Sequence, residues 1–228
     1  MTIIANSLQV IQANILQARL SAKRQDNVKL LAVSKAQSAE KLREAYLAGQ
    51  TAFGENYLQE AINKKSLLGD CNIEWHFIGP IQSNKTQLIA QHFSWVHSVD
   101  RLKIAQRLSI ARSPTLPPLN ICIQVNSSEE SSKSGIQTQE LKDLAREITM
   151  LPNIKFRGLM SIPAFTEDIA KQRMQFKIVK DAYTALQQNG FEIDTLSIGM
   201  SNDYVAAIAE GATIVRIGSA IFGERTKT

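Results

Sequence analysis

The chain has few of the residues that mark specialised classes of protein. Its 228 residues include only 2 cysteines, 6 prolines and 11 glycines. Two cysteines outside any thiol motif cannot build a disulfide framework, which excludes a disulfide-stapled scaffold. The modest glycine and proline content argues against long disordered or low-complexity segments.

Long apolar runs are also missing. The N-terminus has no basic stretch ahead of its apolar residues, and Asn6, Gln9, Gln12 and Asn14 interrupt them. This pattern excludes a signal peptide and a membrane span at the N-terminus. We therefore expect a cytoplasmic protein that does not engage the membrane.

Clusters of like charge and of metal ligands are absent as well. The net charge is +5, but lysines and arginines are scattered among glutamates without a basic run or interleaved aromatics. This argues against a nucleic-acid partner and is compatible with a small anionic ligand. The histidines His76, His92 and His97 lack metal-ligand spacing with carboxylates or thiols, so we expect no metal site.

What is present is an alternation of apolar runs and helical patterns. The composition, 44% hydrophobic and 21% charged, is that of a soluble globular protein. Helical patterns separate most of the apolar runs, and an amphipathic helix over residues 3–20 precedes them. The predicted strands cover residues 28–35, 51–56, 73–79, 95–100, 119–126, 154–161, 194–200 and 213–218.

Eight strands with seven intervening helices predict an α/β fold with a parallel sheet. Eight units favour closure into one (β/α)8 TIM barrel that occupies residues 1–228 as a single domain. No full helix fits after the eighth strand, so the N-terminal helix is expected to cover that gap. An open doubly wound sheet is the alternative, but it would normally carry a glycine-rich turn after the first strand. The stretch "VSKAQSAE" contains no glycine.

In this fold, chemistry is located where the strands end at their C-terminal side. Polar residues, a methionine and a glycine lie at or near six of these ends. They are Lys35 after strand one, Asn56 after strand two, His76 in strand three, Met160 and Ser161 in strand six, Ser201, Asn202 and Asp203 after strand seven, and Arg216, Gly218 and Ser219 in or after strand eight.

Strand parity directs two cationic side chains inward. Val215 and Ile217 share the face that suits the helix layer, so Arg216 points into the barrel. Leu31, Val33 and Lys35 share a face in strand one, so the Lys35 side chain can lie at the C-terminal end of the barrel interior. A buried arginine requires an anionic or acceptor partner, which either a ligand or an ion pair within the barrel could supply.

The ends of strands seven and eight form a candidate phosphate site. Asp203 or Asn202 can cap the helix "DYVAAIAEG", Gly218 permits close approach of the backbone to a ligand, and Ser219 adds a hydroxyl. Barrel enzymes often bind phosphate after strands seven and eight. Ordinary capping without a ligand explains the same residues equally well.

A desolvated lysine beside a phosphate site suits a phosphorylated aldehyde. Neutral amine at Lys35 can attack an aldehyde carbon to form a Schiff base. Pyridoxal phosphate is such a compound. A Schiff-base aldolase that acts on a sugar phosphate uses the same two groups and remains a competing interpretation.

Seven stretches resemble one family, the pyridoxal phosphate homeostasis proteins, which are single-domain relatives of the barrel half of alanine racemase. They run in order from about residue 28 to residue 225, and their combination is far more specific than any one of them. The stretches are "LLAVSK", "FGENYLQEA", "WHFIGPIQSNK", "SKSGI", "RGLMSIPA", "LSIGMSNDYVAAI" and "VRIGSAIFGER".

The resemblance implies roles for the residues at the strand ends. Lys35 would carry pyridoxal 5'-phosphate as an internal aldimine, and Arg216 would approach the pyridine nitrogen. Ser201, Gly218 and Ser219 would hold the phosphate, helped by Asn202 or the helix N-terminus. Asn56 would lie near the ring, with His76 and Met160 as wall residues.

The chain departs from the family pattern at three positions. Ser38 stands where a proline is expected, Asn202 where an aspartate is expected, and Ser219 where a threonine is usual. The change at position 202 removes a negative charge beside the phosphate, which should not weaken binding. These departures leave the assignment of Lys35 unaffected.

The resemblance further implies a protein of intracellular vitamin B6 homeostasis, with effects on amino-acid metabolism and without catalytic turnover. The enzymatic alternative is an amino-acid racemase, which needs acid–base groups on both faces of the substrate. Tyr57 and Tyr204 lie near strand ends, but their spacing does not single them out. We expect a monomer. Apo-enzymes that use pyridoxal phosphate would be the proteins that receive the cofactor. Lys133 lies in a predicted loop after strand five.

Overall fold

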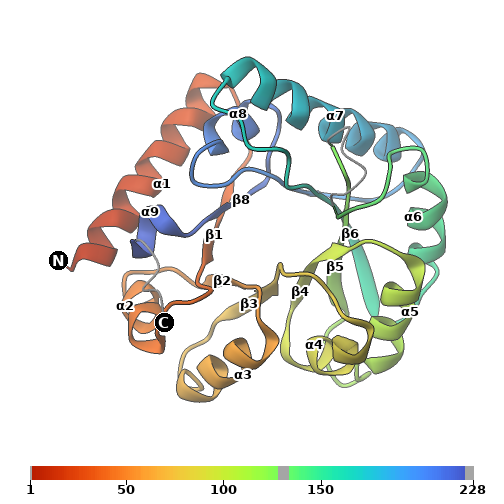
Figure 1. The fold of residues 1–228 in the computed structure, drawn as a ribbon, viewed down its shortest axis with the longest axis horizontal. Coiled ribbons are helices and arrows are strands. Elements are labelled where there is room, and N and C mark those ends of the chain that lie inside the picture. The colour runs from red at the N-terminus through yellow and green to blue at the C-terminus, as the bar shows by residue number, and fades with distance from the viewer. Residues whose placement is uncertain (1, 128–133, 224–228) are drawn as a thin grey trace.

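The computed structural model describes residues 2–127 and 134–223. Within them, eight parallel strands form a closed barrel in chain order, and β1 pairs with β8 to complete the ring (Figure 1). The strands are β1 Lys29–Val33, β2 Ala52–Glu55, β3 Glu74–Phe77, β4 Trp95–Val99, β5 Leu119–Gln124, β6 Ile154–Met160, β7 Thr195–Ser197 and β8 Ile214–Ile217. The predicted (β/α)8 fold is confirmed.

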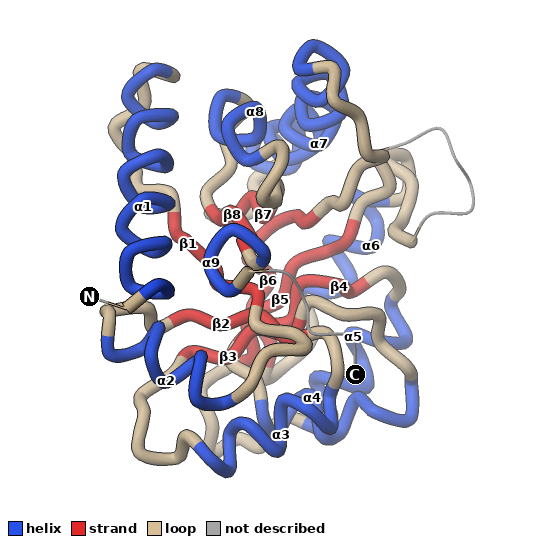
Figure 2. The backbone as a smooth tube through the Cα atoms, turned by 60° about the vertical axis from the view of Figure 1, so that its left-hand side comes forward, coloured by secondary structure: helices blue, strands red, loops and turns tan. Residues whose placement is uncertain are grey.

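Helices surround this ring (Figures 1 and 2). They are α1 Ile3–Ser21, α2 Ala39–Leu47, α3 Leu58–Leu67, the 3-10 turn η1 Ser83–Lys85, α4 Thr86–His92, α5 Leu102–Ala111, α6 Leu141–Thr149, α7 Ile169–Gln188, α8 Tyr204–Ala209 and α9 Ser219–Phe222. In the part of the chain that the structure describes, the helix after β8 is α9, whose four residues are too few to cover the last stretch of the barrel. Helix α1 packs against α8, α9 and α2 and fills this place, as predicted.

The apolar face of α1 explains why it covers the barrel. Ile4, Leu8, Ile11 and Ile15 recur at spacings of three or four residues, and all four are buried in the main hydrophobic core. Thr2 caps the helix, because its hydroxyl accepts a hydrogen bond from the Ala5 N–H. None of the helices in the described part of the chain is long and apolar enough to cross a membrane.

The strands alternate between the helix layer and the barrel interior. Val215 and Ile217 belong to the core between strands and helices, whereas Leu31 and Ile214 form a separate cluster inside the barrel. Arg216 therefore points inward, as its parity predicts, and its backbone lies in register with Leu31 of β1.

Several strands are shorter than their apolar runs. Strand β1 ends at Val33 rather than at Lys35, and β7 ends at Ser197 rather than at residue 200. Gly199 has a φ of +91°, so the chain leaves the extended conformation there. The early ends of β1 and β7 place Lys35, Ser201 and Asn202 on the connecting loops, at the C-terminal mouth of the barrel.

Candidate functional site

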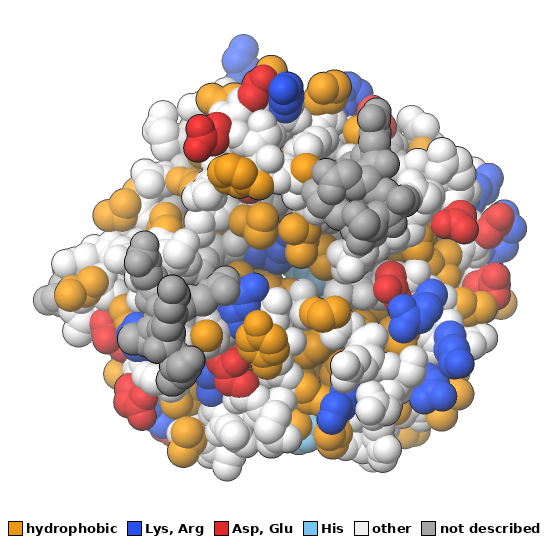
Figure 3. All heavy atoms as spheres, in the orientation of Figure 1, with side chains coloured by type: hydrophobic (Ala, Val, Ile, Leu, Met, Phe, Trp, Pro, Cys, Tyr) orange, Lys and Arg blue, Asp and Glu red, His pale blue; other side chains and the backbone are white. Residues whose placement is uncertain are grey.

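A cavity of about 290 Å³ opens at the C-terminal ends of the strands. This volume lies near the lower end of cavities that bind small molecules, which start at roughly 300 Å³. Figure 3 shows the molecule hollowed near its centre, with hydrophobic and basic side chains around the hollow. Seven of the nine predicted site residues line the cavity: Lys35, Asn56, Ser201, Asn202, Arg216, Gly218 and Ser219.

The backbone on both sides of Lys35 is held by charged side chains of the helix layer. Ser34 accepts a hydrogen bond from Lys64 Nζ through its carbonyl at 2.7 Å. The Ala36 N–H donates to Glu60 Oε1 at 2.7 Å, and Ala36 has a φ of +57°, a left-handed conformation that costs a non-glycine residue energy. The turn that carries Lys35 is thus fixed by Lys64 and Glu60.

A buried ion pair completes this clamp. Lys64 is only 5% exposed and its Nζ lies 2.8 Å from Glu55 Oε1, which also accepts a hydrogen bond from the Ser34 hydroxyl at 2.6 Å. Burial raises the pKa of the Glu55 carboxyl, while Lys64 and Ser34 favour its ionised form. These residues were not predicted from the sequence, because the pattern "GENYLQEAINKK" is typical of an ordinary helix start.

Arg216 brings a buried positive charge to the floor of the cavity. Its guanidinium donates to the carbonyl and the hydroxyl of Ser197 and, at 2.9 Å, to the carbonyl of Ser161. Burial lowers its pKa to about 10, so the group remains protonated near neutral pH. Among the described residues it forms no ion pair, so a structural ion pair does not account for its charge.

The loops after β7 and β8 bring two hydroxyls together. Ser219 Oγ and Ser201 Oγ lie 3.3 Å apart at the cavity wall. Asp203 occupies the N-cap position of α8, but its carboxylate accepts from the Met200 N–H at 2.5 Å rather than from the helix. Asp203 therefore closes the turn that presents Ser201 and exposed Asn202, a role different from the predicted cap.

Two glycines permit close approach of the strands at this mouth. A Cβ on Gly218 would lie 2.9 Å from the Val33 carbonyl oxygen, and one on Gly79 would lie 2.2 Å from the Asn56 carbonyl oxygen. The structural reason for Gly218 is therefore contact with the end of β1. Among the described residues, the buried Oδ1 of Asn56 has no hydrogen-bond partner, so a donor on a ligand could satisfy this acceptor.

Two predicted site residues do not line the cavity. His76 is fully buried inside the barrel and contacts Glu74 and His97. Met160 is fully buried in a cluster with Trp95 and Cys122. Both side chains face the interior, but they lie below the wall where we expected them.

Part of the cavity wall was not predicted from the sequence. Apolar side chains after β6 line the cavity, including Ile162, Pro163 and Phe165 of the stretch "SIPAF", and Phe165 is 76% exposed. Their position directly after a strand end was the available signal. Lys133 and residues 131–133 of its loop lie outside the described residues. Within residues 2–127 and 134–223, no three His, Cys, Asp or Glu side chains are placed to hold a metal ion.

A second hollow of about 300 Å³ lies at the opposite mouth of the barrel, beside α1. Arg19, Asn27 and Gln50 are among its lining residues, and Gln50 donates to the backbone carbonyls of Leu30 and Ala52. Gln50 thus joins β1 and β2, while Arg19 donates to Asn27. The C-terminal mouth is therefore the stronger candidate for ligand chemistry.

Comparison with known proteins agrees with this geometry. The family model for the alanine racemase N-terminal domain matches residues 7–226. A protein of Pseudomonas aeruginosa named pyridoxal phosphate homeostasis protein is 53% identical over 226 residues, which is 99% of this chain and 97% of that protein. The protein of the same name from Escherichia coli K12 is 48% identical over 226 residues, with 97% of each chain covered.

Solved structures show the same fold. PipY of Synechococcus elongatus, solved with pyridoxal phosphate bound, superposes with a TM-score of 0.85 at 34% identity and covers 96% of this chain and 100% of its own. Alanine racemase of Corynebacterium glutamicum superposes with a TM-score of 0.74 at 19% identity, and 61% of its chain is covered. That second likeness concerns the barrel alone. The chain thus belongs to the alanine racemase N-terminal domain family and, within it, to the pyridoxal phosphate homeostasis proteins.

Proposed function

We propose that the protein binds pyridoxal 5'-phosphate in the C-terminal mouth of the barrel, as a Schiff base on Lys35, and acts in intracellular vitamin B6 homeostasis. One observation carries the proposal: Lys35, the Ser201 and Ser219 hydroxyls and the buried Arg216 line a single cavity. An amine, a pair of hydroxyl donors and a buried cation match the aldehyde, the phosphate and the pyridine ring. The names and the bound ligand of the relatives support the same choice.

The residues of the cavity fit this cofactor in separate ways. Lys35 would hold the aldehyde group covalently, because its Nζ can displace the carbonyl oxygen as water. Ser201 and Ser219 donate to the phosphate. Gly218 allows these loops to lie close to β1, and Asn202 borders the same wall. Asn56 offers its unpartnered oxygen to the ring substituents, while His76 and Met160 support the cavity from below.

Arg216 favours a holding role over catalysis. With pyridoxal phosphate bound, the protonated Arg216 guanidinium would donate to the pyridine nitrogen and keep it unprotonated, and such a ring would be a weaker electron sink. Racemisation also needs acid–base groups on both faces of a substrate. Tyr57 and Tyr204 do not border the cavity in the described structure. We therefore propose a cofactor carrier with effects on amino-acid metabolism, located in the cytoplasm, monomeric, and able to supply apo-enzymes.

Borohydride reduction followed by peptide mass spectrometry tests the proposal. The protein is incubated with pyridoxal phosphate, reduced and digested, and we expect one pyridoxyl adduct on Lys35 that disappears in Lys35→Ala. Lys65 is a stringent control, because burial lowers its pKa to about 8 and more of its amine is neutral and reactive, although it lies outside the cavity. Lys65→Met should label like the wild type.

Equal labelling of Lys65 and Lys35 would refute a dedicated Schiff-base site. A racemase assay on the purified, loaded protein then separates the two functional classes. Sustained interconversion of amino-acid enantiomers would contradict the carrier and favour the racemase. Sedimentation analysis checks the monomer.

A further inference from the structure

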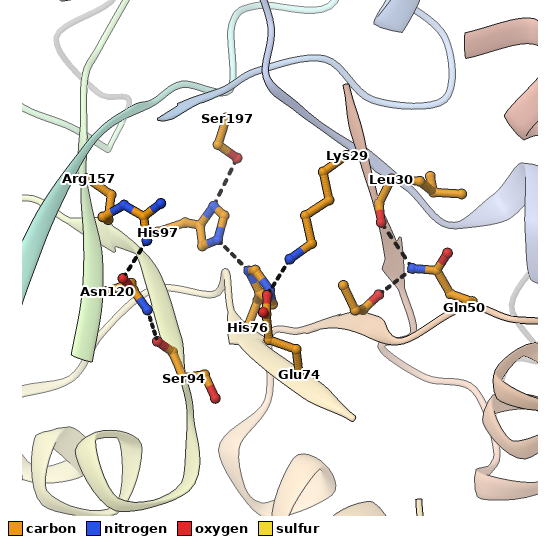
Figure 4. A network of polar contacts seen from close by, with 11 residues as sticks. Lys29, Leu30, Gln50, Glu74, His76, Ser94, His97, Asn120, Arg157 and Ser197 are labelled. Carbon is orange, nitrogen blue, oxygen red and sulfur yellow. Dashed lines mark hydrogen bonds and ion pairs between the residues drawn. The ribbon is translucent and has the colours of Figure 1, made fainter. Parts of the chain in front are cut away.

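The barrel interior contains a chain of hydrogen bonds that ends on Arg216. Figure 4 shows most of it: Lys29 contacts Glu74, Glu74 contacts His76, His76 contacts His97, and His97 contacts Ser197. The His76 Nδ1–His97 Nε2 distance is 2.8 Å, and His97 Nδ1 lies 2.9 Å from Ser197 Oγ. Arg216 Nη1 lies 2.9 Å from the same hydroxyl oxygen.

The chain crosses the barrel. Glu74 is the first residue of β3 and lies with Lys29, the first residue of β1, at the N-terminal mouth. His97 belongs to β4, while Ser197 and Arg216 belong to β7 and β8 on the other side of the ring. His76 and His97 are fully buried, so water does not compete for their nitrogens.

Charge forces one direction on every hydrogen bond in the chain. Hydrogen bonds from His76 and Lys29 lower the pKa of Glu74 to about 2, so its carboxylate only accepts and His76 Nε2 must donate. Burial lowers the pKa of His76 to about 4 and that of His97 well below its usual value, so both rings are neutral. His76 Nδ1 therefore accepts from His97 Nε2–H, and His97 Nδ1 accepts from the Ser197 hydroxyl.

The Ser197 hydroxyl oxygen is then left as an acceptor, and Arg216 Nη1 donates to it. All donors point from Arg216 towards Glu74, with a cation at one end and an anion at the other. In a buried site, such aligned bonds strengthen one another. A neutral histidine with the other tautomer would break the sequence, because two donors or two acceptors would then face each other.

We propose that His97 and Ser197 are positioning residues for Arg216. The chain of hydrogen bonds between Glu74 and Arg216 holds the guanidinium in the orientation in which it contacts a ligand in the cavity. The proposal rests on the proposed function for the identity of that ligand, pyridoxal phosphate. The proposal extends the set of residues that influence binding to Glu74. Glu74 lies at the opposite mouth of the barrel and does not border the cavity.

The arrangement of protons is tested first on the protein without cofactor. Nitrogen-15 NMR of the histidine side chains distinguishes the two neutral tautomers. We expect His76 and His97 both as the Nε2–H tautomer near neutral pH, and a change at His97 in Ser197→Ala. A charged ring or an Nδ1–H tautomer at either histidine would refute the proposed direction of the hydrogen bonds, whichever ligand the protein binds.

The second test is a double-mutant cycle on cofactor binding. Ser197→Ala and Glu74→Gln should each weaken pyridoxal phosphate binding by roughly three- to tenfold, the factor expected for one lost or weakened hydrogen bond. The double variant should be no weaker than the poorer single variant, because the chain is already broken. The absorption spectrum of the bound cofactor should change in both single variants.

Asp70→Asn is the matched control, because it also removes one carboxylate and one ion pair, with Arg43, but belongs to no part of this chain of hydrogen bonds. It should leave both the affinity and the spectrum unchanged. Additive effects, or a Glu74→Gln variant that binds and absorbs like the wild type, would overturn the proposal. If both histidines are Nε2–H tautomers but Lys35 never carries a pyridoxyl adduct, the proposed function is refuted and the proposed direction of the hydrogen bonds is not.

Discussion

At the scale of single residues, the two serine hydroxyls are the clearest candidates for phosphate contacts. Ser201 and Ser219 lie 3.3 Å apart on the loops after β7 and β8. A hydrogen bond to a charged group contributes about 1.5–3 kcal/mol, so one lost hydroxyl weakens affinity at least about tenfold.

We therefore expect Ser219→Ala and Ser201→Ala each to raise the Kd for pyridoxal phosphate by about tenfold or more, measured by equilibrium dialysis. Ser66→Ala, an exposed position on α3, is the control. Unchanged Kd values in both cavity variants would remove these hydroxyls from the phosphate site.

Lys64 is the residue whose loss should cost most stability. Its side chain is buried against Glu55, and removal of one partner leaves the other charge uncompensated. Lys64→Met should lower the free energy of unfolding by about 3–5 kcal/mol at pH 7, measured by urea denaturation. Adding Glu55→Gln should recover part of that loss, because no buried charge then remains. A loss below about 1 kcal/mol would show that the pair is not essential to the clamp around Lys35.

At the scale of secondary-structure elements, the contact between the ends of β8 and β1 is tight. A methyl group on Gly218 would press on the Val33 carbonyl, two residues before Lys35. We expect Gly218→Ala to destabilise the fold by about 1–3 kcal/mol and to weaken cofactor binding, because the strand ends must separate.

Gly69→Ala is the matched control for this change. A Cβ at Gly69 would meet its nearest atoms at 3.9 Å, which is ordinary van der Waals contact. Thermal denaturation of both variants checks the prediction, and equal stability of the two would show that the β8–β1 contact can relax.

Most of the elements could be predicted from the sequence, but their ends could not. Apolar runs with helical patterns between them identified the eight strands. The apolar runs extend past the residues that keep an extended conformation, as at Gly199, where a positive φ ends β7 early. Lys35 and Arg216 followed from alternation along a strand, which is a local property. Glu60, Lys64 and Phe165 did not, because their roles depend on which element packs beside them.

At the scale of the whole molecule, the buried histidines couple the fold to pH. Burial lowers the pKa of His76 to about 4, below the value near 6.5 of the unfolded chain. Between these values the unfolded state binds more protons than the folded state, so the contribution of His76 to stability is fully present above pH 6.5 and is lost as the pH falls towards 4. The shift of His76 corresponds to about 3 kcal/mol.

We expect the free energy of unfolding to decline steadily from pH 6.5 to pH 4, measured by urea denaturation at a series of pH values. His97→Asn should flatten this decline, because one fewer buried ring must take up a proton. His92→Asn, a change at the half-buried end of α4, should keep most of the slope. A flat profile in the wild type would contradict neutral, buried rings.

The sequence by itself determined the alternation of strands and helices, the inward direction of Lys35 and Arg216, and the polar residues at the strand ends. These are properties of neighbours in the chain, which the periods of strands and helices express directly. Only the tertiary structure decided that His76 lies below the cavity and joins Glu74 to Arg216 through His97 and Ser197. Those residues come from β3, β4, β7 and β8, and their distances exist only once the barrel has closed.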